Sequence, residues 1–472
     1  MLIGLPGLLV FAGMAALYSW LVYHPAWLLE AEVPGHDGRP AVDPSKAAQI
    51  NLAGVFQKSD GHPASLPGAW TSFRGPAASN IATDPTSLAD SWPEGGPKVV
   101  WKVPVGDGYA APTVLNGCVY LMDYDVEKRA DAVRCLSLED GKEIWRRSYD
   151  INIKRNHGMS RTIPAVTDRY VVTVGPKCHV VCLDAARGDF RWGIDLTKDF
   201  GTEVPLWYSG QCPFIDNDVA VIAPCGASAL LIGVACETGK VLWQTPNPRG
   251  WKMSHSSVIP MTLLGRKVYL YSALGGTACV SAEPDSSGKL LWDLPWDAKV
   301  VAPSPVKAGE DLIFVTAGYG KGSRLLKVQA TAGGMGVEVV YDKTPDQILS
   351  CEQQTPIFHE GLLYGIMPKD AGALKGQFVC MKPDGTTVWS SGADNRFGLG
   401  PFLLADGKFL ILDDEGALTM LDATKPGYSL LGHAEILHGH DAWGPLALAG
   451  SRLLLRDMNN LACVELGAGT AS

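Results

Sequence analysis

The chain has 472 residues, a formal net charge of −9 and 19% charged residues, with no basic stripe. Because nucleic acids are bound by positively charged surfaces, this balance argues against a nucleic-acid partner. The 53 glycines and 32 prolines are typical of a turn-rich, all-β chain.

The first 23 residues predict a membrane-spanning helix. Residues 2–23 carry no charged side chain, and an apolar run of about 22 residues is long enough to cross a bilayer. Tyr18, Trp20, Tyr23 and Trp27 gather at its far end, where an interfacial aromatic belt would lie. A cleaved signal peptide is the weaker alternative, because no Lys or Arg precedes the apolar run.

Two further segments precede the main domain. Residues 24–69 are rich in Pro, Gly, Asp and Ser without a sustained period, which predicts a tether. Residues 70–96 form a more specific leader, which begins Trp-Thr-Ser-Phe-Arg-Gly-Pro. We expect this leader to pack on the rim of the domain that follows.

A five-residue pattern recurs along the rest of the chain. Gly-Lys-x-x-Trp occurs at residues 141–145, 239–243 and 288–292, with looser copies at 188–192 and 385–389. A repeat of about 45 to 50 residues indicates a repeat architecture. In each copy a Gly turn joins a short apolar strand to a strand that carries the Trp.

A second marker gives the number of repeats. A proline followed by two apolar runs, split by a turn, recurs eight times, at Pro112, Pro164, Pro213, Pro260, Pro305, Pro356, Pro401 and Pro445. Each unit therefore predicts a hairpin, a third strand, a Gly turn and a Trp strand, which is one blade of a β-propeller. Blade 5 offers Tyr341 where the Trp is expected.

The ends of the repeat predict how the ring closes. The eighth unit stops at Leu466 after three strands, whereas the segment 97–101 before the first unit is an extra strand with its own Trp101. We expect this N-terminal strand to complete the last blade and remove the open edge. The predicted fold is thus an all-β, eight-bladed propeller over residues 97–472, preceded by one transmembrane helix.

The 11 cysteines are interpreted mainly as core residues. Five of them occupy the same place in the third strand of a blade: Cys135, Cys182, Cys279, Cys380 and Cys463. A small apolar position that repeats in a strand indicates buried packing. If any disulfide exists, Cys178 with Cys182, or Cys212 with Cys225, are the pairs to test.

These motifs resemble a known family. Over residues 70–466 the Gly-Lys-x-x-Trp unit is similar to the repeat of pyrroloquinoline quinone (PQQ)-like, eight-bladed propellers, and the leader resembles that of a membrane-anchored bacterial branch. This family includes the quinoprotein alcohol dehydrogenases and, more distantly, the propeller lipoprotein of the outer-membrane protein assembly machine. The resemblance implies the fold, whereas one branch is enzymatic and the other is a scaffold.

Candidate binding residues lie where each first strand begins, beside the central funnel, where the resembled fold holds its ligand. The blades differ there while their Gly and Trp positions agree, and a ring of polar groups could hold a planar ligand. The alternative is that these groups bond one another and water. The candidates are Tyr109, His157, Arg161, Gln211, His255, Glu352, Gln353, Arg396, Asp441 and Trp443.

The resemblance also allows the enzymatic branch to be weighed. Quinoprotein dehydrogenases carry adjacent cysteines beside the quinone, and here no two cysteines are adjacent. They also hold calcium with carboxylates, for which Glu352 and Asp441 are the residues to compare. A PQQ-dependent dehydrogenase with PQQ and calcium in the funnel is therefore the alternative function, and we predict no catalytic or metal-binding residue.

We accordingly expect a membrane-anchored, periplasmic PQQ-like propeller that acts as a protein-interaction scaffold or as a ligand-binding subunit. Its expected partners are the membrane, through the N-terminal helix, and a membrane protein complex. Its expected location is the cytoplasmic membrane, with the propeller in the periplasm.

Overall fold

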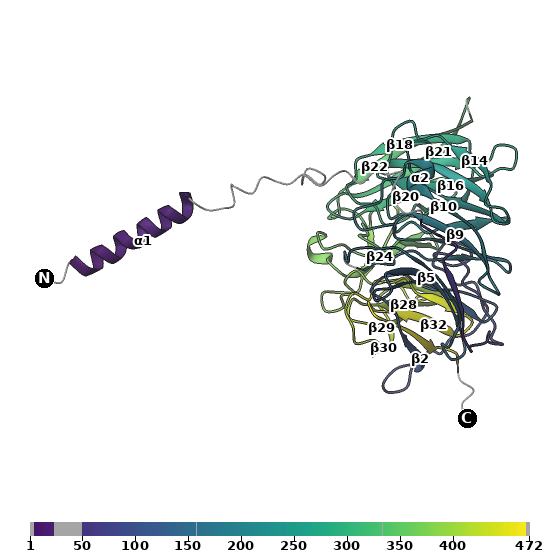
Figure 1. Ribbon diagram of the computed structural model, residues 1–472, viewed down its shortest axis with the longest axis horizontal. Coiled ribbons are helices and arrows are strands. Elements are labelled where there is room, and N and C mark those ends of the chain that lie inside the picture. Colours follow the sequence, from purple (N-terminus) through teal and green to yellow (C-terminus); the bar gives the residue numbers. More distant parts are fainter. Residues whose placement is uncertain (1–3, 23–49, 157, 333, 469–472) are drawn as a thin grey trace. The chain divides into compact units, whose positions relative to one another are not determined.

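A computed structural model describes residues 4–22, 50–156, 158–332 and 334–468 (Figure 1). The chain divides into two compact units, residues 1–50 and 51–472. In the first unit, helix α1 spans Gly4–Val22. Within the described ranges, no helix is long and apolar enough to cross a membrane, so the transmembrane helix predicted for residues 1–23 is not found.

The described residues of the second unit form eight antiparallel sheets, which confirms the eight predicted blades. Their strands follow one another from the channel outward. Blade 1 contains β3 (Thr113–Leu115), β4 (Cys118–Asp125), β5 (Ala130–Ser137) and β6 (Glu143–Asp150); blade 2 β7 (Ala165–Val166), β8 (Tyr170–Val174), β9 (His179–Asp184) and β10 (Phe190–Asp195); blade 3 β11 (Phe214–Asp216), β12 (Val219–Ile222), β13 (Leu231–Ala235) and β14 (Val241–Thr245); blade 4 β15 (Ile259–Leu263), β16 (Arg266–Ala273), β17 (Gly275–Ser281) and β18 (Leu290–Trp296).

The later blades repeat this order. Blade 5 contains β19 (Val306–Lys307), β20 (Leu312–Ala317), β21 (Gly322–Thr331) and β22 (Gly334–Lys343); blade 6 β23 (Ile357–His359), β24 (Leu362–Ile366), β25 (Phe378–Met381) and β26 (Thr387–Ser390); blade 7 β27 (Phe402–Ala405), β28 (Lys408–Leu412), β29 (Ala417–Asp422) and β30 (Leu430–Glu435); blade 8 β31 (Ala447–Ala449), β32 (Arg452–Arg456) and β33 (Asn460–Glu465). Short helical turns α2 (Leu196–Phe200) and η3 (Gly372–Leu374) lie in connections.

The ring closes as the sequence predicts. Strand β2 (Lys98–Pro104) pairs antiparallel with β33, with Trp101 opposite Cys463, and so supplies the fourth strand of blade 8. The first and last parts of the propeller are thereby joined in one sheet. Because β2 pairs with β33, blade 8 has four strands like the other blades, and β33 is not left as an unpaired edge.

The repeated Gly and Trp touch each other across blades. A Cβ atom added at any of four turn glycines would come within 2.6 to 2.8 Å of the indole of the preceding blade. The pairs are Gly141 with Trp101, Gly188 with Trp145, Gly239 with Trp192, and Gly288 with Trp243. Each indole thus covers the turn of the next blade, and Trp101 of the closure strand does so for blade 1.

Hydrogen bonds strengthen the same contact. The indole N–H of Trp101 donates to the carbonyl of Leu138 at 3.0 Å, and that of Trp192 to the carbonyl of Cys236 at 2.7 Å. In blade 5, where Tyr replaces Trp, the hydroxyl of Tyr341 donates to the carbonyl of Pro383 in blade 6. The degenerate blade therefore keeps the contact with its neighbour.

All 11 cysteines are buried and free, including the five at the third-strand position. The core-packing interpretation is confirmed, and neither Cys178 with Cys182 nor Cys212 with Cys225 is joined. Apolar clusters lie between neighbouring blades; one of them combines residues of blades 2, 3 and 4, such as Val172, Leu231 and Tyr271.

The tether ends earlier than predicted. Strand β1 (Val55–Lys58) adds a fifth, outermost strand to blade 1 by pairing with β6, and the amide of Ala64 donates to the carbonyl of Gly117. Residues 51–69 therefore belong to the propeller unit, because backbone groups of this segment find partners on blade 1. Most of the remaining predicted tether, residues 24–49, lies outside the described residues.

The leader packs on the propeller, but along the inner strands rather than on the rim. Trp70 pairs with Val114 of blade 1, and the carbonyl of Thr71 accepts from the amide of Val166 in blade 2. Further on, the side chain of Arg74 donates to the carbonyl of Pro356 in blade 6 at 2.9 Å. The segment then runs beside blade 7, where Ile81 pairs with Leu404. It therefore crosses one end of the central channel.

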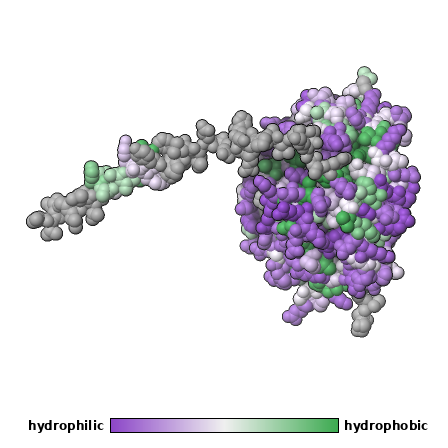
Figure 2. Space-filling view, viewed as in Figure 1, coloured by the Kyte–Doolittle hydropathy of each residue, from purple (hydrophilic) through white to green (hydrophobic). Residues whose placement is uncertain are grey.

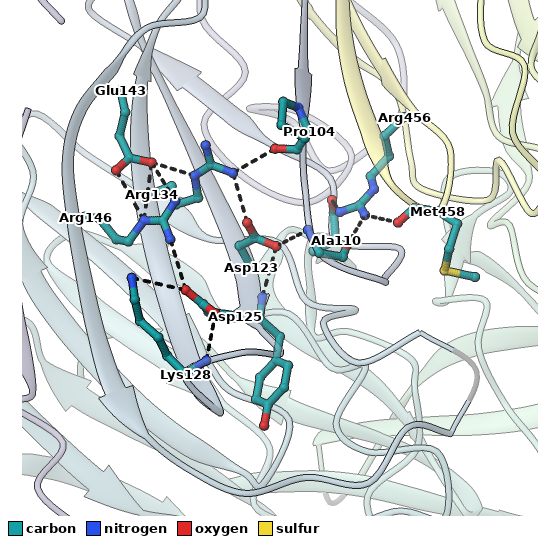
Figure 3. Close-up of polar contacts among 12 residues, drawn as sticks. Pro104, Ala110, Asp123, Asp125, Lys128, Arg134, Glu143, Arg146, Arg456 and Met458 are labelled. Atoms are coloured by element: carbon teal, nitrogen blue, oxygen red, sulfur yellow. Dashed lines mark hydrogen bonds and ion pairs between the residues drawn. The ribbon is translucent and has the colours of Figure 1, made fainter.

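Two arginines hold the end of the closure strand and the segment that follows it (Figure 3). Arg456 is buried and donates to the carbonyls of Ala110 at 2.9 Å, Gly106 at 3.0 Å and Met458 at 2.9 Å. Arg134 donates to the carbonyl of Pro104 at 3.1 Å and to Asp123 at 2.9 Å. Burial lowers the pKa of Arg456 to about 10, so this side chain remains charged at neutral pH.

The interblade contact predicts a specific cost for Gly239→Ala. Gly239 and Gly265 share a φ of 72°, but an added Cβ at Gly239 would lie 2.7 Å from Trp192, whereas at Gly265 nothing lies within 4 Å. Both substitutions strain the backbone by about 1 kcal/mol. Gly239→Ala also displaces the indole, which adds about 1 to 3 kcal/mol of overpacking. Chemical denaturation measures both variants, and equal losses of unfolding free energy would contradict the contact.

A buried carboxyl predicts an unusual pH dependence. Asp131 accepts a hydrogen bond from Tyr149 at 3.0 Å, its other oxygen has no partner, and burial raises its pKa to about 8. Because the folded pKa lies above the unfolded one, this group's contribution is full below about pH 4 and is lost as the pH rises towards 8. Asp131→Asn cannot ionise, so its stability relative to the native chain should increase from pH 5 to pH 9. Parallel profiles in urea denaturation would disprove this.

Candidate functional site

The funnel end of the propeller is built from two kinds of connection. In an antiparallel blade the link into the first strand and the loop between the second and third strands lie at the same end. Tyr109, Arg161, Trp207 and His255 come from the links, and Tyr319 comes from the loop between β20 and β21. This end lies opposite the one that the leader crosses.

These connections surround a cavity of about 310 Å³. Four aromatic side chains line it, Tyr109, Trp207, Tyr319 and Trp443, and Phe73 of the leader contributes from the opposite end. Phe73 also packs against Ile163 and Cys212 of blades 2 and 3. The leader therefore helps to turn an open channel into a cup.

Six of the ten predicted residues line this cavity: Tyr109, Arg161, His255, Glu352, Gln353 and Trp443. The sequence argument placed them together because each begins, or directly precedes, an inner strand. Their role in binding stays a prediction.

The other four do not line the cavity. Gln211 is fully buried and bonds the backbone of Cys212 and Ala223. Arg396 lies on an exposed loop, where it donates to the carbonyl of Ala393 at 2.9 Å. Asp441 lies 3.2 Å from the Nδ1 of His440. His157 is outside the described residues.

Among the lining residues that the sequence argument did not select are Trp207, Tyr319 and Lys369. The sequence argument read back from each proline and so considered mainly the links between blades. In the link into blade 3 it selected Gln211 and not Trp207. Tyr319 and Lys369 lie in loops between second and third strands. Since these loops reach the same end, aromatic and basic residues there were the signal that could have identified them.

The aromatic rings form two groups on the walls of the cavity. Tyr109 packs on Trp443 with ring centroids 5.2 Å apart. Trp207 stacks on Tyr319 at 6.4 Å, with an angle of 19° between the rings, and contacts His255 at 6.1 Å. The N–H of Trp443 donates to Asp414 at 2.7 Å, and its carbonyl accepts from Gln354 at 2.9 Å. Flat surfaces are therefore held in place around the cup.

Arg161 supplies an unpaired positive charge. Its guanidinium lies 5.0 Å from the ring centroid of Tyr109 and donates to the carbonyl of Asn156 at 3.1 Å. Its Nε is buried without a partner, and among the described residues no carboxylate lies within ion-pair distance. Burial lowers the pKa of Arg161 from its usual high value.

Glu352 and Lys369 form a half-satisfied pair. Lys369 Nζ lies 3.1 Å from Glu352 Oε1, and this bond raises the pKa of Lys369. The Glu352 side chain is 3% exposed, and its Oε2 has no hydrogen-bond partner. Lys369 also lies 4.7 Å from the ring centroid of Tyr319. The pair is electrically neutral but leaves one buried acceptor free.

His255 is neutral at physiological pH. Burial, with the charge of Arg161 as a second cause, lowers its pKa to about 4. The lining side chains therefore sum to one positive charge, that of Arg161, because Glu352 and Lys369 cancel.

A calcium-held quinone does not fit these donors. Calcium takes roughly 6 to 8 oxygen ligands, carboxylates prominent among them. Glu352 is the one carboxylate among the residues that line the cavity, and Lys369 already pairs with it. Across the described part of the chain, no three His, Cys, Asp or Glu side chains form a group that could hold a metal.

Residues 129–349 match the family described as outer membrane protein assembly factor BamB. The sequence matches no curated protein. BamB from Moraxella catarrhalis is 14% identical, covering 78% of this chain and 99% of that one with a TM-score of 0.52.

Two other solved structures are similar in fold. A europium-containing methanol dehydrogenase is 12% identical, covering 83% of this chain and 89% of that one with a TM-score of 0.57. The computationally designed Ika8 protein is 10% identical, covering 78% of this chain and 99% of that one with a TM-score of 0.50. The domain is thus an eight-bladed β-propeller that is similar in fold to these proteins.

Proposed function

We propose that this chain is a protein-interaction scaffold whose funnel end binds a partner protein. The observation that carries the proposal is the difference between the two ends of the channel. The leader crosses one end and bonds to inner strands there, whereas the other end presents loops around an aromatic cup. A partner can therefore reach ordered, partly apolar surface at the funnel end.

Exposed apolar side chains on the funnel loops support this assignment. Leu206 is 76% exposed in the link between blades 2 and 3, Val126 is 54% exposed between β4 and β5, and Tyr319 is 44% exposed. In the view of Figure 2 most of the propeller surface is hydrophilic, with hydrophobic residues in small patches. Apolar loop residues around a concavity are typical of an interaction surface.

The matched family name supports a role in assembly rather than catalysis, because BamB is described as an outer membrane protein assembly factor. We propose that the partner belongs to a membrane protein complex and that the propeller lies in the periplasm. The PQQ-dependent dehydrogenase reading has the cavity in its favour, but the donors around that cavity do not suit the metal.

Paired leucine variants test the binding end. Leu206→Asp places a charge on the funnel loops, whereas Leu242→Asp places it on β14, the outer strand of blade 3, where Leu242 is 51% exposed. Partners are cross-linked in the native host, identified by mass spectrometry, and titrated against each purified variant. We expect Leu206→Asp to weaken binding about tenfold or more, as a charge in an interface core does.

Leu242→Asp is the control and should bind as the native chain does. If it lost the partner while Leu206→Asp retained it, the binding surface would be the outer edge of the blades, and the proposal would be wrong.

A further inference from the structure

Beyond the scaffold role, we propose that the funnel cavity binds a small, flat aromatic carboxylate that carries a ring N–H or hydroxyl group. The inference starts from the shape of the cup. A cavity of roughly 150 Å³ holds one benzene ring. The volume here, about 310 Å³, therefore suits a two-ring molecule.

The walls select flat molecules. Trp207 and Tyr319 are nearly parallel, at 19°, and Tyr109 and Trp443 lie against each other among the lining residues. Aromatic rings in a ligand gain offset-stacked and edge contacts with such walls. An aliphatic ligand of the same volume would lack these contacts.

The charge of the site selects an anion. Among the described residues Arg161 has no carboxylate partner, and there its guanidinium donates one hydrogen bond, at 3.1 Å, to the backbone carbonyl of Asn156. Its stacking on Tyr109 at 5.0 Å holds the guanidinium in place. A planar guanidinium that is fixed and unpaired matches a carboxylate in geometry and in charge.

The unpaired oxygen of Glu352 favours a ligand that carries a hydrogen-bond donor. Glu352 Oε2 is buried without a partner, although a buried charged oxygen normally has one. A ring N–H or hydroxyl would satisfy it. A ligand ammonium is disfavoured, because Lys369 already lies 3.1 Å from the same carboxylate. The site therefore favours a monoanion over a zwitterion or a cation.

A series of indoles tests each part of this argument on the purified full chain without any partner. Indole-3-acetate carries the carboxylate and the ring N–H, and 3-methylindole lacks the carboxylate. Tryptamine replaces the carboxylate with an ammonium, tryptophan adds an ammonium, and 1-methylindole-3-acetate blocks the ring N–H. Isothermal titration calorimetry measures each affinity.

We expect indole-3-acetate to bind about tenfold or more tightly than each of the other four, since each charged hydrogen bond is worth at least that factor. Arg161→Met should remove the preference for the carboxylate, and Glu352→Gln the preference for the ring N–H. Arg396→Gln is the control, because Arg396 lies on an exposed loop outside the cavity.

The ligand series on the native chain decides the matter even if a variant does not fold. Equal affinities across the series, a preference for tryptamine, or no binding of any indole at millimolar concentration would overturn the proposal. None of these results would contradict the proposed scaffold function, because the titration contains no partner protein. Conversely, loss of the partner in Leu206→Asp would not alter the titration.

Discussion

The propeller depends on one contact that is repeated at four successive junctions between blades, from blade 8 to blade 4. An indole on the outer strand of one blade covers the glycine turn of the next, closely enough that no Cβ fits at Gly141, Gly188, Gly239 or Gly288. A blade alone has an apolar face on each side of its sheet, and stacking buries both. The contact sets how one blade lies on its neighbour, and Trp101 extends it across the closure, from β2 to the turn of blade 1.

Closure then determines what lies at the two ends of the channel. The chain enters through β1 on blade 1, crosses the inner strands as the leader, and returns as β2 in blade 8. Arg134 of blade 1 bonds the carbonyl of Pro104 at the end of β2, and Arg456 of blade 8 bonds the carbonyl of Ala110 after it, so the start of blade 1 is held against blade 8. Because the leader occupies one end, the ligand and the partner that we propose would reach the cup from the other end, where loops differ from blade to blade.

Much of this fold follows from the sequence because the repeat is explicit. Eight prolines, the spaced Gly and Trp, and an extra strand before the first unit predict eight blades and the closing strand, and Tyr341 occupies the predicted place of a Trp. The buried cysteines follow from their repeated position in third strands. The course of the leader could not be predicted from the sequence, because its hydrogen bonds, such as that from Arg74 to Pro356, join residues far apart in the chain.

Part of the candidate site also follows from the sequence, because the repeat places equivalent positions of the blades next to one another. Tyr109, Arg161 and Glu352 precede inner strands, and the repeat places those positions together. Tyr319 and Lys369 lie in loops between second and third strands, which the proline marker does not reach. Gln211 and Arg396 have the right position in the repeat, but one points into the blade and the other lies on the surface. Side-chain direction in an irregular link has no periodicity from which to infer it.

The central claim is that β2 is an integral part of the ring rather than a strand added to a finished one. Hydrogen–deuterium exchange of the native chain measures this directly, by comparing the amides of Trp101 and Val103 in β2 with those of β16 inside blade 4. If closure holds the ring together, the β2 amides exchange only through global unfolding, at the rate of the slowest amides of β16. Exchange of β2 that is faster by orders of magnitude and insensitive to denaturant would show local detachment and contradict the account.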